Sequence, residues 1–404
     1  MPIVIDIKTR IFDKNDKAYR LFPGQGYRYY KVMKDYSRIF LDNPGIPMPS
    51  AGGYKKNEET LHAIVRSEVK QREVYAGSEN LPELVKHIDA RPIGNVRWSK
   101  RRSLSLSWLN TLYYDASPGD LVILPSPGFI KEGENWVFYK TLIGEIIGEP
   151  ERWTENGPLN ILAGRYLVRK VKWLAEVDEA DLDRGLIGTL RTQNALVAVK
   201  AQAFERALGA AYKNIVIDNE FLARFNTESA DFKASESFHF GAFAMAVVAA
   251  MRQINGEGEA FSDDSSIYDI AATVPSDDTY VPDQEASIHS PGYLTIRGMF
   301  LVPAVISALF ALALTPDAQL FAAEQIEAVE VVNSESPAYD PCEVGIEESV
   351  RRSLEIIGLN RWKQMCQAAA KSNENEGLKS ITSVEVPKPR PHINGDADGD
   401  GEGG

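Results

Sequence analysis

The stretch GDLVILP, residues 119–125, is followed by IGEIIG at residues 143–148 and by RKVKWL at residues 169–174. All three are rich in residues that favour strands, and the first two contain the glycine and proline residues that commonly end strands. Together they predict a small β-barrel over residues 92–200. Nothing else in the chain resembles an active site, so the prediction of function depends on this barrel.

Two local features indicate how these strands are connected. Residues 119–125 and 136–148 are expected to form a hairpin with a loose loop between them. Asp120 follows a glycine turn, so its carboxylate is expected to accept hydrogen bonds from that turn, while alternate side chains of the strand point inward. Gly144 and Gly148 are expected to mark the places where a strand bends hard enough to close a barrel.

The order of these motifs, followed by an acidic helix over residues 178–190, resembles PUA-like and EVE-like domains. The nearest form is the specificity domain of modification-dependent restriction enzymes and related prokaryotic, including antiviral, defence proteins. The resemblance covers about residues 92–200, a quarter of the chain. It implies a pocket that holds one base, often a modified base, between aromatic side chains.

Aromatic side chains matter to such a pocket because extracting a base costs a few kcal/mol, and stacking on a ring recovers roughly 1–3 kcal/mol. Tryptophan in a barrel is usually part of the core, and this is expected of Trp173, which lies in an alternating strand. The resemblance does not determine which other ring lines the pocket. The candidates are Trp98, Trp108, Trp136 and Tyr139.

Basic residues cluster at two places in the predicted barrel. The densest group lies beside Trp98 and suits either phosphate contacts or a solvated loop. In the second group Lys170 and Lys172 share one face of a strand, and Arg169 lies on the other. The candidate phosphate-binding residues are Arg97, Lys100, Arg101, Arg102, Arg165, Lys170 and Lys172.

Charge is distributed unevenly along the 404 residues, whose formal net charge is −13. Residues 1–113 carry 20 Lys and Arg against 12 Asp and Glu, whereas residues 201–404 carry 14 against 32. The basic amino-terminal region is expected to attract phosphate, and the acidic carboxy-terminal region to repel it. An acidic surface can also serve only to keep a protein soluble.

The patterns along the chain predict an α+β protein in four parts. A basic mixed α/β region over residues 1–91 precedes the PUA/EVE-like barrel at residues 92–200. An acidic, mainly helical domain follows at residues 201–372, with a long loop at residues 255–292. Residues 373–404 have the low-complexity acidic composition of a disordered tail.

The longest uncharged run, residues 298–314, contains Pro303 and has only the minimum length of a membrane span. A second apolar run lies at residues 238–251, and we expect the two to form a buried helical pair, so no membrane association is predicted. Two cysteines are too few for a disulfide framework. The first residues lack the basic and apolar segments of a signal peptide. Together with the low cysteine count, this favours a reducing cytoplasm.

Motifs for catalysis are scarce. The chain has no phosphate-binding glycine loop, and its two cysteines and five histidines lack the spacing of metal ligands. We therefore predict no cofactor and no metal. Glu68-Val69-Lys70 matches the Glu-x-Lys of restriction nucleases, with Asp89 nearby, but residues 58–75 have the periodicity of a helix.

Three functions follow from these observations. The leading hypothesis is a non-catalytic subunit that recognises DNA or RNA and acts with a partner effector, or as a homo-oligomer, through residues 201–372. The first alternative is a scaffold that binds other proteins through that helical domain. The second alternative is a metal-dependent nuclease that uses Glu68, Lys70 and Asp89.

Overall fold

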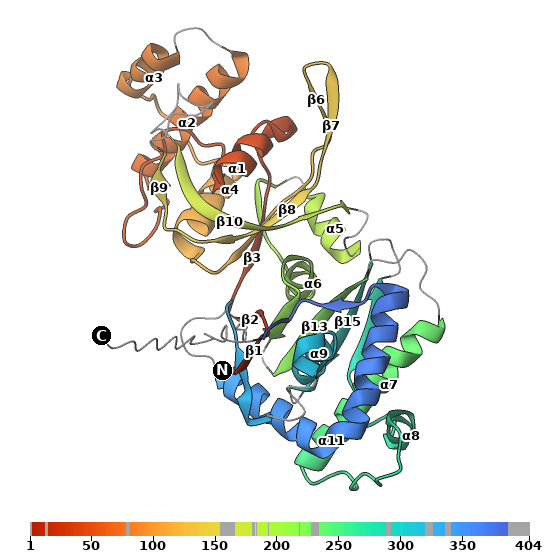
Figure 1. Ribbon diagram of the computed structural model, residues 1–404. Coiled ribbons are helices and arrows are strands. Elements are labelled where there is room, and N and C mark those ends of the chain that lie inside the picture. Colours follow the sequence, from red (N-terminus) through yellow and green to blue (C-terminus); the bar gives the residue numbers. More distant parts are fainter. Residues whose placement is uncertain are drawn as a thin grey trace, which may run out of the picture. The chain divides into compact units, whose positions relative to one another are not determined.

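The computed structural model divides the chain into two compact units (Figure 1). The inserted unit comprises residues 13–212, and the outer unit comprises residues 1–12 and 213–404. The sequence had placed boundaries near residues 91 and 200 instead. The structure describes residues 2–12, 15–77, 81–153, 166–179, 182, 184–192, 194–217, 219–227, 234–287, 292–299, 301–319, 326–335 and 341–386.

The inserted unit is built on a seven-stranded sheet in the order β11-β3-β5-β8-β10-β4, with β9 paired to β10. Strands β3 and β5 are parallel, whereas β5, β8, β10 and β4 pair antiparallel in turn. The strands are β3 (Ala18–Leu21), β4 (Arg38–Ile39), β5 (Leu121–Leu124), β8 (Thr141–Ile146), β9 (Glu151–Arg152), β10 (Leu167–Val177) and β11 (Leu196–Ala198).

This sheet corrects the prediction of a barrel made by residues 92–200 alone, because β3 and β4 come from the region before residue 92. Among the described residues, no pairing joins β11 to β4 at the two ends of the strand order. The predicted pairing of residues 119–125 with 136–148 is confirmed, since β5 and β8 run antiparallel with Leu121 opposite Glu145.

Helices cover both faces of the sheet, and for this reason all four residues of β5 are buried. Val122 and Leu124 join one apolar cluster, and Ile123 joins another with Leu186. A strand buried on both faces reads as a continuous apolar run, so the expected inward alternation is wrong. The helices are α1 (Tyr30–Tyr36), α2 (Glu58–Ala76), α3 (Leu81–Ala90), α4 (Lys100–Asn110), α5 (Arg184–Leu190) and α6 (Ala201–Ala211), with the short turns η1 (Gln25–Tyr27) and η2 (Thr111–Asp115).

The turn before β5 forms as the sequence predicts. The Asp120 carboxylate accepts hydrogen bonds from the backbone N–H groups of Ser117 (2.8 Å) and Lys17 (3.0 Å). Gly144 was expected to allow a bend in the strand, but in the structure it makes room for a neighbouring side chain. A Cβ atom there would lie 2.7 Å from Cε3 of Trp173, so a glycine lets this partly buried ring pack against the strand.

The loose loop expected at residues 126–135 is instead part of a two-stranded ribbon, β6 (Gly128–Glu132) and β7 (Asn135–Tyr139). Figure 1 shows this ribbon extending from the sheet of the inserted unit. Cross-strand partners share a face of a ribbon, so its two faces can have different surroundings.

The outer unit contains much more strand than the predicted mainly helical domain. Its six-stranded sheet has the order β14-β15-β13-β12-β2, with β17 paired to β13, and a smaller sheet has the order β16-β1-β18. The strands are β1 (Ile3–Asp6), β2 (Thr9–Phe12), β12 (Asn214–Ile217), β13 (Glu220–Thr227), β14 (Asp283–Ser287), β15 (Gly292–Gly298), β16 (Val329–Val332), β17 (Lys379–Ser380) and β18 (Ser383–Glu385).

Two predictions for the outer unit are corrected by these strands. The expected long loop at residues 255–292 contains a helix and strand β14, while residues 288–291 lie outside the described residues. The expected disordered tail is ordered over residues 373–386, where β18 pairs with β1 and Leu378 is buried. Its remainder, residues 387–404, lies outside the described residues.

The apolar runs form the expected buried pair of helices. Every residue of α9 (Val302–Ala313) is buried, and Phe310 packs edge-on against Phe240 and Phe243 of α7 (Ala234–Ile254). Within the described residues, no helix is long and apolar enough to cross a bilayer. The other helices are α8 (Ile267–Thr273) and α11 (Pro341–Glu376), which is interrupted at Gly358, and the short turn η4 (Ile326–Ala328).

Candidate nucleic-acid interface

The predicted basic cluster Lys100-Arg101-Arg102 forms the first turn of α4 rather than a loop. Ser99 caps this helix, since its hydroxyl accepts a hydrogen bond from the Arg102 backbone N–H at 3.3 Å. Arg97 and Trp98, which precede the cluster, lie in an irregular connection. The cluster is visible in the sequence, but the helix that presents it was not predicted for these residues.

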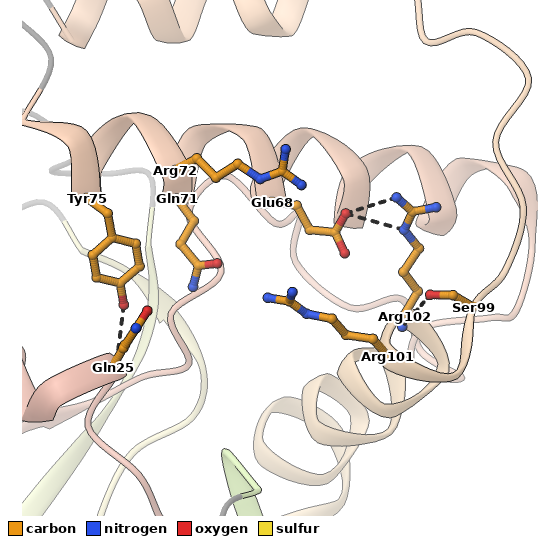
Figure 2. A pocket seen from close by; sticks show the side chains of 8 residues that line it. All are labelled: Gln25, Glu68, Gln71, Arg72, Tyr75, Ser99, Arg101 and Arg102. Carbon is orange, nitrogen blue, oxygen red and sulfur yellow. Dashed lines mark hydrogen bonds and ion pairs between the residues drawn. The ribbon is translucent and has the colours of Figure 1, made fainter.

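A polar pocket of about 420 Å³ lies between α2 and the start of α4. This volume is within the range of pockets that hold small ligands, roughly 300–1,000 Å³. Figure 2 shows Arg101 reaching from α4 across the pocket toward α2, while Arg72 lies along α2 toward Glu68. The lining residues are Gln25, Glu68, Gln71, Arg72, Tyr75, Ser99, Arg101 and Arg102.

One of the three arginines in the pocket is held by the fold. Arg102 donates to Glu68 Oε2 through Nε at 3.3 Å and Nη2 at 3.0 Å, and to the Arg97 carbonyl at 3.0 Å. Both partners of this pair are largely buried, so the pair ties α4 to α2 and fixes the wall. Guanidinium groups are well suited to such two-point contacts with a carboxylate.

The other two arginines have no such partners. No hydrogen bond or ion pair joins the guanidinium of Arg72 or of Arg101 to another residue within the described ranges, and both side chains are exposed. The pocket thus presents three cationic groups against the single carboxylate of Glu68. An anion is the ligand that this imbalance favours.

The position of the basic cluster on α4 adds to this imbalance. The amino-terminal end of a helix has a partial positive charge, so basic side chains in the first turn reduce helix stability while acidic ones increase it. The first turn of α4 contains no acidic residue. Bound phosphate would offset this repulsion and accept hydrogen bonds from the free N–H groups of the turn.

The end of the pocket opposite α4 is organised around Asp42. Its carboxylate accepts hydrogen bonds from the Tyr75 hydroxyl at 2.5 Å and the Tyr166 hydroxyl at 3.2 Å, and its backbone carbonyl accepts one from Gln71 Nε2 at 2.9 Å. Burial is the largest cause that raises the pKa of both phenols, so both stay protonated and act as donors. The positions of Tyr75 and Gln71 are therefore fixed without a ligand.

The predicted aromatic candidates do not line this pocket. Trp98 is partly buried against the core of the inserted unit, with Lys56 Nζ 5.7 Å from its ring centre. Tyr139 is also buried, at the end of β7, where its hydroxyl donates to Glu132 Oε1 at 2.5 Å and its ring packs on Tyr30. Tyr139 is therefore part of the core, and Trp98 packs against it.

Trp136 differs from them because 67% of its surface is exposed. In the register of the ribbon it lies opposite Lys131, and Phe129, exposed by 65%, lies opposite Phe138, exposed by 43%. All four side chains therefore share one face of the ribbon. The other face packs on the core through Ile130 and Val137. We call the exposed side, made by Phe129, Lys131, Trp136 and Phe138, the aromatic face.

The second predicted basic group is dispersed. Arg165 lies outside the described residues, Lys170 forms a 3.6 Å ion pair with Glu151, and Lys172 is exposed on β10. Arg169 is fully buried and donates to the carbonyls of Gly148 (2.9 Å) and Leu112 (3.2 Å). None of these residues lines the pocket.

The residues proposed for a nuclease do not form a catalytic group. Glu68 is paired with Arg102, and the buried Lys70 ammonium lies 2.6 Å from Asp89 Oδ1. Within the described part of the chain, no three acidic, histidine or cysteine side chains lie close enough to hold a metal ion. Residues 58–76 are helical as their periodicity predicts, whereas restriction nucleases place these groups on strands.

Five residues of the pocket were not predicted from the sequence. Three of them belong to α2, and with Glu68 they follow the spacing i, i+3, i+4 and i+7 of one helical face. A polar stripe opposite the apolar one was therefore visible in the sequence. The other two, in η1 and at the N-cap of α4, had no such periodic signal. The five are Gln25, Gln71, Arg72, Tyr75 and Ser99.

A comparison with protein-family models gives no match for this chain, and a comparison with curated proteins gives none either. The functional argument therefore rests on the geometry of the pocket and of the ribbon.

Proposed function

We propose that the inserted unit recognises nucleic acid and that the pocket between α2 and α4 binds a backbone phosphate. The observation that carries this proposal is the pair of guanidinium groups, Arg72 and Arg101, that face the cavity without partners among the described residues. Arginine binds phosphate oxygens through two parallel N–H donors, and such contacts supply most of the affinity of non-specific nucleic-acid binding.

The distribution of charge between the two units supports the proposal. Residues 13–212 contain 29 Lys and Arg against 25 Asp and Glu, a balance of +4. The rest of the chain contains 15 against 32, a balance of −17. A polyanion is therefore attracted to the inserted unit and repelled by the outer unit.

The aromatic face gives the same unit a second means of contact. Exposed rings on a ribbon stack with unpaired bases, and each stack contributes roughly 1–3 kcal/mol. Lys131, beside Trp136 in the register, is placed to meet the adjoining backbone. A strand that reaches both the aromatic face and the pocket would be held by stacking and by ion pairs together.

In this proposal, the chain recognises the nucleic acid and a second protein carries out the reaction. The protein acts as a recognition subunit in the cytoplasm, reads a modified or flipped base, and leaves chemistry to a partner effector, as the resemblance to prokaryotic defence proteins implies. Residues 201–372, which belong to the outer unit from residue 213 onward, would bind that partner or a second copy of the chain.

Fluorescence anisotropy with labelled DNA and RNA, at two salt concentrations, tests the phosphate contacts. The Arg72→Ala/Arg101→Ala variant should bind about tenfold or more weakly, and its salt slope should fall by about two, one for each lost phosphate contact. Arg184→Ala is the matched control, since this exposed residue of α5 does not line the pocket. Equal binding by the double variant and the control would refute the proposal.

A protein scaffold is the second candidate, favoured by one feature of the outer unit. Phe238 is 60% exposed and stacks in parallel on Tyr268 at 5.3 Å, with His239 Nδ1 3.0 Å from the Tyr268 hydroxyl. An exposed aromatic ring held in one position by such a stack offers an apolar contact for a partner protein. Sedimentation of the wild type and of Phe238→Ser tests this candidate: a self-association that the variant loses supports it, and a monomer in both opposes it.

A further inference from the structure

A network of hydrogen bonds fixes the side of the pocket at Tyr75, away from the guanidinium groups that would bind a phosphate. Asp42 holds Tyr75 through its carboxylate and Gln71 through its carbonyl, and the Tyr75 oxygen also accepts the Gln25 backbone N–H at 3.3 Å. Behind this layer, the hydroxyl groups of Tyr29 and Tyr166 lie 3.2 Å apart and extend the network into the core.

The orientation of the Gln71 amide follows from this network. A backbone carbonyl can only accept a hydrogen bond, so the Gln71 atom that contacts the Asp42 carbonyl must be the nitrogen. The side-chain oxygen is then directed to the other side. Figure 2 shows it turned toward the middle of the pocket, toward Arg101. Gln71 therefore presents a hydrogen-bond acceptor at a fixed position.

Tyr75 adds an aromatic surface beside this acceptor. The Arg28 guanidinium covers its ring at 4.2 Å from the centre, and Arg28 does not line the pocket. A ligand in the pocket therefore meets the opposite face of the ring or its edge. One end of the cavity thus has an aromatic ring and an acceptor, and the other has guanidinium groups.

We propose that the pocket holds a single unstacked nucleotide, with its phosphate at Arg72 and Arg101 and its base against Tyr75 and Gln71. This inference rests on the proposed function and assigns the base-reading site to residues other than the predicted rings. The base it favours carries an exocyclic amino group, as cytosine, adenine and guanine do, because such a group donates to the Gln71 oxygen.

Thymine and uracil suit this acceptor poorly. Their N3–H donor lies between two carbonyl oxygens, so an approach to the Gln71 oxygen brings acceptors together. The amino group of cytosine or adenine projects from the corner of the ring, where the pairing edge offers a donor with fewer adjoining acceptors. The fixed amide therefore discriminates between bases without a charged group.

The test measures anisotropy with thymidine hexamers that carry cytosine, thymine or an abasic residue at one central position. The wild type should bind the cytosine probe most tightly, and loss of the base should weaken binding about tenfold, the effect of one lost stack. Gln71→Met should bind the cytosine and thymine probes equally. Tyr75→Phe, which keeps the ring, should retain the penalty for the abasic probe, and Tyr75→Leu should lose it.

The outcomes separate this inference from the proposed function. If the three probes bind the wild type equally while Arg72→Ala/Arg101→Ala still weakens binding, the nucleotide pocket is refuted and phosphate recognition stands. If no probe shows salt-dependent binding, the proposed function itself fails. Thermal unfolding identifies a Tyr75→Leu protein that does not fold, and the abasic comparison in the wild type then decides the question alone.

Discussion

Lys70 and Asp89 provide a prediction that separates a structural ion pair from a catalytic one. The Lys70 side chain is 2% exposed within α2, and its ammonium lies 2.6 Å from Asp89 Oδ1 of α3. Asp89→Asn removes the charge that compensates a buried cation, whereas Lys70→Met removes the cation itself and keeps most of the length of the side chain. The first substitution should destabilise the inserted unit strongly, and the second only slightly.

The expected magnitude follows from how deeply each partner is buried. An uncompensated buried charge costs about 3–5 kcal/mol. Because 35% of the Asp89 side chain is exposed, water screens part of this effect, and we expect Asp89→Asn to cost about 2–3 kcal/mol. Lys70→Met should cost about 1 kcal/mol or less, since the remaining carboxylate can be hydrated. The double variant should cost about as much as Lys70→Met alone, because it no longer contains the buried cation that Asp89 compensates.

Urea unfolding followed by tryptophan fluorescence is the suitable assay, since five of the six tryptophans belong to the inserted unit. A coupling free energy of about 2 kcal/mol in the double-mutant cycle is the expected result. Strictly additive costs, or a Lys70→Met variant as unstable as Asp89→Asn, would refute the reasoning. Loss of metal-dependent DNA cleavage in a folded Lys70→Met protein would restore the nuclease hypothesis.

Three further predictions concern buried groups. Burial raises the pKa of Tyr29 to about 12. The stability that the protonated Tyr29 contributes is therefore complete below pH 10.0 and is lost as the pH rises toward 12. In a pH titration, the absorbance of the Tyr29 phenolate should appear together with unfolding. Burial also raises the pKa of Cys366 to about 12, so in a Cys342→Ser background a thiol reagent should label Cys366 only when the outer unit unfolds. Gly144→Ala should cost about 1–3 kcal/mol in chemical denaturation, because its Cβ would lie 2.7 Å from the Trp173 ring.

Local features of the fold were predictable from the sequence because nearby residues determine them. The β5–β8 pairing and the Asp120 turn depend on hydrogen bonds and strand propensity within short segments. The strands that join this sheet from distant parts of the sequence were not predictable in this way. Strand β3 pairs in parallel with β5, more than a hundred residues later, and such a pairing depends on tertiary packing that no local pattern encodes.

The candidate site was predictable in part for a similar reason. Lys100, Arg101 and Arg102 stood out by their density, but only tertiary structure brings α2 opposite the start of α4. Trp98 and Tyr139 were chosen by residue type, and residue type does not distinguish a ring in the core from one on the surface. Trp136 was identified without the ribbon that exposes it.

Buried cations show why net charge alone would not have identified the interface. Three of the cations are buried, namely Arg20, Lys70 and Arg169, and each is bound to backbone carbonyls or to a carboxylate. They contribute to the balance of +4 in the inserted unit but cannot meet a ligand at its surface. A phosphate responds to cations that it can reach and that no other group already compensates. Arg72 and Arg101 meet both conditions in the pocket, so the loss of either one should affect binding far more than the loss of the same single charge at Arg184.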